Sequence, residues 1–589
     1  MIMTREEELI EKIQQMCDED REAEVIEMID ALPEEERTYK IVGLQARTLS
    51  NLAANIRNGY YDSNQEPDAL DRRALDILTA TAEEGKDDPN WWCRNGYTRM
   101  NLRMEAEAIP YFEHVMTLID DDPETQEFWS DVPEAIEKCR QTVSFLEHPS
   151  RQTPPYGKTR SWMIAIPRDE SHVPDTDLAA ACIAGIEGVE NLTYERADDK
   201  ETGTILKIYG SFKGESFECE IDKVTAFNPN GLKYGTYFNK ADTDMLTKRL
   251  SGYGIDLKPG RGTPMEWLRL QLLIADIVVP DMLALHDLSS HQALSGLWVK
   301  SVAKSTVPPP PDIAFNIETE CNNDGGDIWM YTTGMERFGL PDIEIMHGTQ
   351  NHERCHNILI KTVARSLLCS TDTGTESDTH WQPKINSPIA IMAGGVPLYV
   401  RLLPWEEAIK DGDRNTDAPG SIRTRLERMN SQSCVLFAYP DEQAAAEDLY
   451  QPLWMMDDYL TNDMADNMQS LIDGKEMERR SRVTAERMDL MERVAHNAPQ
   501  HEVMLRLWLE DEDGEPTDKW AKITKYTDRH NFEAEIEDNG DKIGIRFVNE
   551  PDGRIISWAI PIENFIITAD SAYILDAEPR LKEQLGLQD

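Results

Sequence analysis

The chain has 589 residues, 40% of them hydrophobic and 29% charged, which is the composition of a folded globular protein and suggests about three or four domains. Its formal net charge is −49, so its surface should repel the phosphates of nucleic acids and the headgroups of anionic lipids. We therefore expect neither a nucleic acid bound through its backbone nor a membrane as a partner, whereas a basic protein would be attracted.

The first residues, Met1–Glu8, are acidic and lack the basic and apolar pattern of a leader segment. No apolar run approaches the ~20 residues that span a bilayer. Nine cysteines are scattered without a Cys-x-x-Cys pair, which is typical of reduced thiols and not of a disulfide framework. These features predict a cytoplasmic protein.

Residues 1–148 have a helical pattern throughout, with an internal period. Asp88-Pro89 recurs 34 residues later as Asp122-Pro123, and Ala74 precedes Ala108 by the same interval. A period of 34 is the length of a tetratricopeptide repeat, which is a pair of helices. We therefore predict an all-α domain of tetratricopeptide-like repeats at 1–148, followed by a linker at 149–160.

Within this repeat, Trp92, Gly96 and Tyr97 take first-helix positions, and Ala108 and Phe112 line the second helix. Gly96 would let the two helices approach closely. A short repeat array exposes a concave groove that binds a partner peptide, and Trp92 and Tyr97 are our candidates for contacting it. The alternative is a helical cap that only packs against the next domain.

Residues 158–460 mix strands and helices with hairpin-like spacing, which favours an α+β domain over a doubly wound parallel sheet. The expected strands lie at 162–166, 192–194, 205–212, 215–221, 313–317, 328–333, 343–346, 389–392, 398–402 and 434–439. Helices are expected at 175–188, from Thr263-Pro264 onward and at 350–368, and a polar loop is expected at 371–380.

The centre of this domain is Asp327–Met346, which predicts two strands joined by a tight turn. If this hairpin is scaffold, Trp329 or Tyr331 should be buried against the facing strand, and Ile343→Ala should cost ~2–5 kcal/mol. Arg337 stands at the turn between two acids, so we expect an exposed ion pair worth ~0–1 kcal/mol. It is also a candidate protein-binding residue of the turn.

The same stretch follows the pattern T-x-G-(L/M)-x-R-x-G-(L/I)-P-(D/E)-(L/I)-E-I from Thr332 to Ile345. It resembles an uncharacterised bacterial family, a domain of unknown function often found behind tetratricopeptide repeats. The strand Trp162–Pro167, the helical segment Leu294–Trp298 and the run Pro308–Pro311 agree with it, so the resemblance covers roughly 158–460. Family members carry His-Thr-His-Gly-Leu at the turn where this chain has Tyr-Thr-Thr-Gly-Met, so no role of those histidines is carried over.

His352-Glu353-Arg354-Cys355-His356 is a literal H-E-x-x-H sequence. On a helix the two histidines share a face, so both can bind zinc while Glu353 polarises a water molecule. A third ligand would have to come from downstream, from Glu376, Asp378 or His380. The alternative is a buried stripe that includes Cys355, Leu359 and Val363 and leaves both histidines at its edge as partly covered polar residues.

Two further groups of residues could carry chemistry but are more simply explained as structural. His286, Asp287 and Ser289 offer the ingredients of nucleophilic catalysis, but sequence neighbours rarely form a triad, and such residues at a helix end are typical of caps and turns. Gly394-Gly395 between two strands predicts a hairpin turn and not a phosphate loop. Neither a P-loop nor a dinucleotide-binding glycine motif is present in the sequence, so we expect no cofactor.

The carboxy-terminal part divides into a charged helical connector at 461–498 and a small β-rich domain at 499–589. Alternating residues predict strands near 503–507, 520–523, 532–536, 543–549 and 555–560. This part is similar to a second small bacterial domain of unknown function that often accompanies the first.

The leading hypothesis is a non-enzymatic protein of a bacterial cytoplasm that binds another, possibly basic, protein. Such a protein would serve as a scaffold or as a neutralising, immunity-like protein. The first alternative is a zinc-dependent hydrolase that uses His352, Glu353 and His356. The second is an acidic mimic of nucleic acid that would compete with DNA for a basic target.

Overall fold

The computed structural model divides the chain into two compact units. The first unit contains Met1–Gln152 with Arg425–Met429, and the second contains the remaining residues. The described residues are 4–19, 21–57, 65–119, 129–147, 160–197, 203–225, 233–260, 262–321, 327–369, 389–393, 396–409, 419–421, 424–425, 433–457, 460, 474–510, 516–538, 541–548 and 554–587. The expected loop at 371–380, the Gly394-Gly395 turn and Asp122-Pro123 lie outside them.

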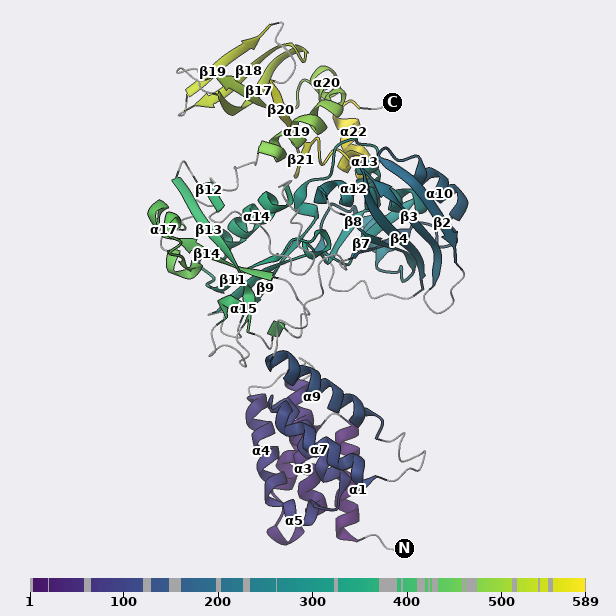
Figure 1. Ribbon diagram of the computed structural model, residues 1–589, viewed down its shortest axis with the longest axis vertical. Helices are drawn as coiled ribbons and strands as arrows, with labels where there is room; N and C mark the ends of the chain where they lie inside the picture. The colour runs from purple at the N-terminus through teal and green to yellow at the C-terminus, as the bar shows by residue number, and fades with distance from the viewer. Residues whose placement is uncertain are drawn as a thin grey trace. The chain divides into compact units, whose positions relative to one another are not determined.

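The described part of the first unit is helical (Figure 1). Consecutive helices pack together, most extensively α3 with α4 and α6 with α7, followed by α7 with α9. The helices are α1 (Arg5–Asp18), α2 (Glu22–Asp30), η1 (Glu34–Glu36), α3 (Tyr39–Arg57), α4 (Pro67–Ala80), α5 (Ala82–Gly85), α6 (Pro89–Asn101), α7 (Glu105–Leu118) and α9 (Asp131–Glu147). The all-helical character predicted for this region is confirmed.

The helix α6 begins and packs as its sequence predicts. The Asp88 side chain accepts a hydrogen bond from the backbone N–H of Asn90, and Pro89 occupies the first turn, where a missing N–H costs little. A Cβ atom on Gly96 would lie 2.6 Å from the Phe112 ring, so only glycine allows α6 and α7 to come this close. The close approach expected at Gly96 is confirmed.

The second unit begins with an eight-stranded sheet in the order β2-β3-β4-β6-β1-β7-β8-β5. Its strands are β1 (Ser161–Pro167), β2 (Val189–Arg196), β3 (Thr204–Phe212), β4 (Glu215–Val224), β5 (Lys233–Tyr234), β6 (Gly252–Lys258), β7 (Met282–Asp287) and β8 (Gln292–Ser295). Its helices are α10 (Thr176–Ala184), α11 (Lys240–Leu246), α12 (Pro264–Val278) and α13 (Gly296–Ala303).

Both faces of the central strand β1 are buried, which explains its uninterrupted apolar run. Met163 and Ala165 join the main core beneath α12, while Ile164 and Ile166 pack on the other face with Leu246 of α11. The helix expected at Leu294–Trp298 starts only at Gly296, because Leu294 and Ser295 end β8. A Cβ atom on Gly296, the first residue of α13, would lie 1.9 Å from the carbonyl oxygen of Met282, so only glycine fits where the helix begins.

The second sheet has the order β12-β13-β14-β11-β10-β9, with β15 on β14. The predicted strand at 313–317 starts only at Asn316, because Pro310 and Pro311 lead into a 3-10 turn. The elements are η3 (Pro311–Ile313), β9 (Asn316–Cys321), β10 (Ile328–Thr333), η4 (Glu336–Phe338), β11 (Asp342–Gly348), α14 (Glu353–Cys369), β12 (Ile389–Ala393), β13 (Val396–Pro404), α15 (Trp405–Ala408), β14 (Ser433–Tyr439), α17 (Glu442–Ala446), β15 (Gln451–Pro452) and η6 (Leu453–Met456).

The third sheet is antiparallel and has the order β19-β18-β17-β16-β20-β21. Its strands are β16 (Met504–Glu510), β17 (Pro516–Asp528), β18 (Asn531–Asp538), β19 (Asp541–Phe547), β20 (Ile555–Ile562) and β21 (Phe565–Thr568). Helices α19 (Gly474–Glu486) and α20 (Met488–Asn497) precede it, and α21 (Ile574–Ala577) and α22 (Pro579–Gln584) follow it. The β-rich character predicted for this part is confirmed.

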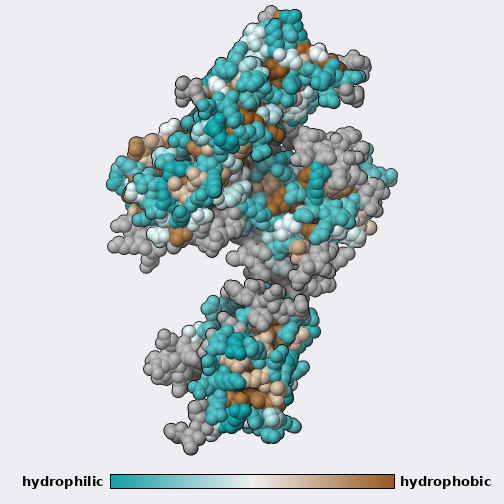
Figure 2. Space-filling model, turned by 180° about the vertical axis from the view of Figure 1, so that it is seen from behind, coloured by the Kyte–Doolittle hydropathy of each residue, from teal (hydrophilic) through white to brown (hydrophobic). Residues whose placement is uncertain are grey.

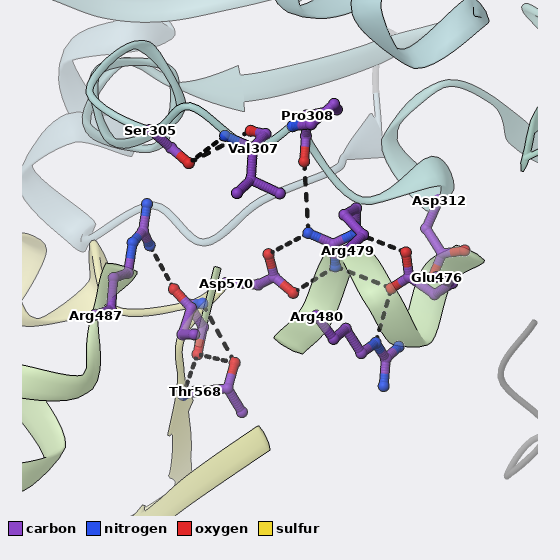
Figure 3. Close-up of polar contacts among 12 residues, drawn as sticks. Ser305, Val307, Pro308, Asp312, Glu476, Arg479, Arg480, Arg487, Thr568 and Asp570 are labelled. Atoms are coloured by element: carbon purple, nitrogen blue, oxygen red, sulfur yellow. Dashed lines mark hydrogen bonds and ion pairs between the residues drawn. The ribbon is translucent and has the colours of Figure 1, made fainter. Parts of the chain in front are cut away.

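All three sheets share one hydrophobic core, which extends from Met163 to Leu587. Polar contacts connect α19 to the end of the third sheet and to the segment between α13 and η3 (Figure 3). Arg479 of α19 pairs with Glu476 at 2.6 Å and with Asp570 at 2.7 Å, and its Nη1 donates to the carbonyl oxygen of Pro308 at 3.5 Å. The predicted divisions at 460 and 498 therefore fall inside one compact unit.

Hydrophilic residues prevail on the face of the molecule shown in Figure 2, as the charged composition predicts. Among the described residues, none of the helices combines the length and apolarity that crossing a bilayer requires.

Candidate functional site

The helical unit contains a groove of about 500 Å³. Its walls come from α3, from α6 and from the start of α9, the helices that would be the first members of successive helix pairs. The lining residues are Arg47, Ser50, Asn51, Ala54, Asn90, Cys93, Arg94, Tyr97, Thr98, Asn101, Trp129 and Asp131. This volume lies in the range of ordinary ligand pockets, and most of the lining residues have polar or charged side chains.

Two arginines in the groove form no ion pair with a described residue. Neither Arg47 nor Arg94 forms an ion pair or a hydrogen bond with any residue in the described part of the chain. Burial lowers the pKa of Arg94; the neighbouring positive charge of Arg47 adds to that effect, and the negative charge of Asp88 opposes it. Arg47 and Arg94 lie far apart in the sequence and share no local motif, so the sequence does not predict that they line one groove.

The two aromatic candidates of this unit have different positions. Tyr97 lines the groove, and its hydroxyl donates to Asp131 at 2.7 Å. Trp92 is not among the groove-lining residues. Its ring packs against Tyr111 and His114, and its Nε1 donates to the carbonyl oxygen of Lys86 at 2.9 Å. Trp92 therefore packs between α6 and α7.

In the second unit, the predicted hairpin is β10 and β11, joined through η4. Met330 pairs with Ile345 across the two strands, and Trp329, Tyr331 and Ile343 are all buried. The burial predicted for this stretch is confirmed. It extends to both faces, because consecutive residues of β10 and β11, which point to opposite faces of the sheet, are buried.

The expectation for Arg337 is wrong. Its side chain is 1% exposed and does not pair with the flanking acids at the turn. It points into the core, where Nη1 lies 2.7 and 2.8 Å from the two carboxylate oxygens of Asp287, and Nη2 donates to the carbonyl oxygen of Ala314 at 2.6 Å. A buried guanidinium is not available to a partner at the surface, so Arg337 is a structural residue.

Asp287 joins this ion pair to a turn between two strands. Its carboxylate also accepts from the backbone N–H of Ser289 and from the hydroxyl of Ser290. The turn role expected for these residues is therefore right, although they follow β7 and not a helix. His286 precedes Asp287 on the same strand and points to the opposite face, so the two do not form a catalytic pair.

The family comparison adds to this geometry. Residues 161–309 match the N-terminal model, and residues 316–437 the C-terminal model, of a protein of unknown function, DUF4026. The pair of Asp287 and Arg337 therefore connects the two matched segments. No tetratricopeptide model matches the helical unit. No curated protein and no solved structure matches the chain significantly.

The H-E-x-x-H segment lies at the start of α14. His352 precedes the helix, and its carbonyl oxygen accepts the first helical hydrogen bond from the N–H of His356 at 2.9 Å. Asp457 approaches both rings, with one oxygen 2.8 Å from Nε2 of His356 and the other 3.3 Å from Nδ1 of His352. One nitrogen of each ring is thus engaged by a carboxylate, while Glu353 is exposed.

The helical phase predicted His356 at the edge of the buried stripe, but its side chain is fully inside the core. It is 1% exposed, and its Nε2 is hydrogen-bonded to Asp457, about a hundred residues later in the chain. Burial lowers the pKa of His356, and the neighbouring Asp457 opposes that effect. Within the described ranges no group of three or more His, Cys, Asp and Glu side chains could hold a metal ion. The suggested third ligands, Glu376, Asp378 and His380, lie outside those ranges.

Buried His286 should make the protein sensitive to acid. Burial lowers its pKa to about 4 from the ordinary 6.5. The unfolded chain then takes up this proton near pH 6.5 and the folded chain only near pH 4, so stability is full above 6.5 and falls as the pH drops through this window. The measurement is the free energy of unfolding by denaturant at pH 7 and at pH 4. Between these two pH values the His286→Gln protein should lose roughly 2–3 kcal/mol less stability than the unchanged protein. An unchanged pH dependence would contradict this prediction.

Proposed function

We propose that the protein is a non-enzymatic, cytoplasmic binding protein that holds a segment of another protein in the groove of its helical unit. In this proposal α3 with α4 and α6 with α7 act as tetratricopeptide-like repeats. The observation that carries it is the groove with its two unpaired arginines, Arg47 and Arg94. The nine cysteines, all within the described residues and all free thiols, support a reducing compartment.

The net negative charge of the chain and the positive arginines of the groove would attract different parts of a partner. The net charge of −49 attracts a basic protein from afar and speeds its encounter. Inside the groove, however, the arginines favour a carboxylate, because an unpaired guanidinium gains most from a bidentate acidic partner. We therefore expect the inserted segment to carry at least one acidic group, even where the partner as a whole is basic.

Reversing the charge of Arg47 tests the groove. Arg47 is exposed and unpaired, so Arg47→Glu should change the stability by no more than about 0.5 kcal/mol. In affinity capture with the full-length chain from a bacterial lysate, we expect Arg47→Glu to reduce recovery of the specific partner about tenfold or more, because it places a like charge against the carboxylate. Quantitative mass spectrometry measures the recovery.

Arg72→Glu is the matched control. Arg72 is an exposed arginine on α4 of the same unit, outside the groove, and its substitution changes the net charge equally. A partner that is retained by Arg72→Glu and lost by Arg47→Glu supports the proposal. If both variants recover the same proteins as the unchanged chain, the groove is not the binding site.

A further inference from the structure

A second concave site lies in the other unit, at the junction of its parts. It has a volume of about 630 Å³ and is formed by α13, by the segment around α20 and by the C-terminal helices α21 and α22. Five cationic side chains line it: Lys300, Lys304, Arg487, Arg493 and Lys582. They come from three parts of the chain, so only the folded unit brings them together.

Four of these cations form no ion pair with a carboxylate in the part of the chain that the structure describes. Among the described residues, Lys300, Lys304, Arg487 and Arg493 form no ion pair. The contact of Lys300 is the carbonyl oxygen of Pro280 at 3.5 Å. Burial raises the pKa of Asp276 on α12 and the charges of both lysines act to lower it, but Asp276 forms no ion pair with either lysine. The chain has 109 acidic and 60 basic residues, so a cluster of four basic side chains without an ion pair is unexpected and suggests an anionic ligand.

The two arginines donate to neutral oxygens instead. Nη2 of Arg487 donates to the carbonyl oxygen of Ser301 at 3.0 Å, and Nη2 of Arg493 donates to that of Leu587 at 3.2 Å. These contacts hold the guanidinium groups in place without neutralising them. Each arginine therefore keeps its charge for an anion in the site.

The acidic residues at the rim are already occupied. Glu486 accepts a hydrogen bond from the hydroxyl of Ser305 at 2.5 Å. Burial raises the pKa of Glu486, but its hydrogen bonds with Ser305 and Thr306 outweigh that effect, so the pKa is lowered. Asp576 pairs with Lys582 at 2.5 Å, and Asp489 lies 3.4 Å from Arg529. Among the described residues none of them forms an ion pair with Lys300, Lys304, Arg487 or Arg493, although the charges of Asp570 and Glu486 act on Arg487. Figure 3 shows Ser305 and Arg487 beside the contacts that join α19 to the third sheet.

We propose that this site binds a small polyanion, a molecule that presents phosphate groups or several carboxylates. Guanidinium groups match both anions through paired hydrogen bonds, and lysines add point charges. The volume is that of an ordinary small-molecule site. The ligand would touch α13, α20 and the C-terminal helices together, so it would also stabilise the junction between the sheets. This site is independent of the groove in the helical unit.

Calorimetric titration of the full-length protein tests the proposal, with inorganic pyrophosphate in one arm and citrate in the other, at ionic strength matched with sodium chloride. We expect one equivalent of at least one anion to bind and to raise the melting temperature. The double variant Lys300→Ala with Lys304→Ala should weaken binding about tenfold or more, since it removes two charge-assisted contacts. The arm that binds identifies the anion chemistry.

Lys248→Ala is the matched control, because Lys248 is exposed, follows the end of α11 as Lys304 follows α13, and lies outside the site. It should bind as the unchanged protein does. If the double variant melts at a lower temperature without ligand, Lys304→Ala alone provides the comparison. The proposal is overturned if neither anion binds the unchanged protein, or if the lysine variants bind as tightly as Lys248→Ala.

Discussion

Replacing Arg337 by alanine is expected to lower the free energy of unfolding by about 3–5 kcal/mol, the usual cost of breaking a buried ion pair from one side. The substitution leaves the carboxylate of Asp287, itself fully buried, without its counter-charge. It also removes the donor to the carbonyl oxygen of Ala314. Denaturant unfolding of the full-length chain, followed by circular dichroism, measures the loss.

Two companion variants separate charge from packing. Arg337→Lys keeps the charge but loses the paired geometry, so we expect an intermediate loss. Asp287→Ala with Arg337→Ala should cost less than the sum of the two single changes, because neither charge is then left alone. An Arg337→Ala protein as stable as the unchanged one would mean that the buried pair contributes nothing.

The second large effect is expected at Ile343, where alanine should cost about 2–5 kcal/mol. Ile343 has no exposed surface, and its strand β11 lies between β10 and β14, so neighbouring strands on both sides prevent the cavity from closing. Denaturant midpoints of the two proteins measure the difference.

Ile566→Ala is the matched control, since Ile566 also lies in a strand but is 64% exposed. It should lose no more than about 0.5–1 kcal/mol, because its side chain gains little from burial. Equal losses at Ile343 and Ile566 would contradict the assignment of the hairpin to the core.

Features that depend on near neighbours were predictable from the sequence. Alternating residues around Trp329 and Ile343 predicted two strands, and the glycines between them predicted the turn. Gly339 indeed adopts a left-handed φ of 70°, which glycine adopts readily. Pro89 and Gly96 likewise predicted where α6 begins and how closely α7 packs. These properties follow from backbone sterics and side-chain periodicity over a few residues.

The candidate sites depended on distant contacts and were mostly not predictable. Arg337 has two acids near it in the sequence, yet among the described residues it pairs with Asp287, 50 residues earlier. His356 is buried, and its partner Asp457 lies about a hundred residues later in the sequence. The unpaired arginines of the groove and the cations around Lys304 come from separate helices, and no pattern within one helix connects them.

The sequence by itself determined the charge of the molecule, the order of a helical region before β-rich regions, and the buried hairpin, because composition and local periodicity decide these. The tertiary structure alone decided which charges are neutralised. Whether an arginine finds a carboxylate depends on which segments the core brings within about 4 Å, where two opposite charges in water attract by about 1 kcal/mol; the attraction weakens further with distance and with salt. The groove and the polyanion site therefore exist only in the folded protein.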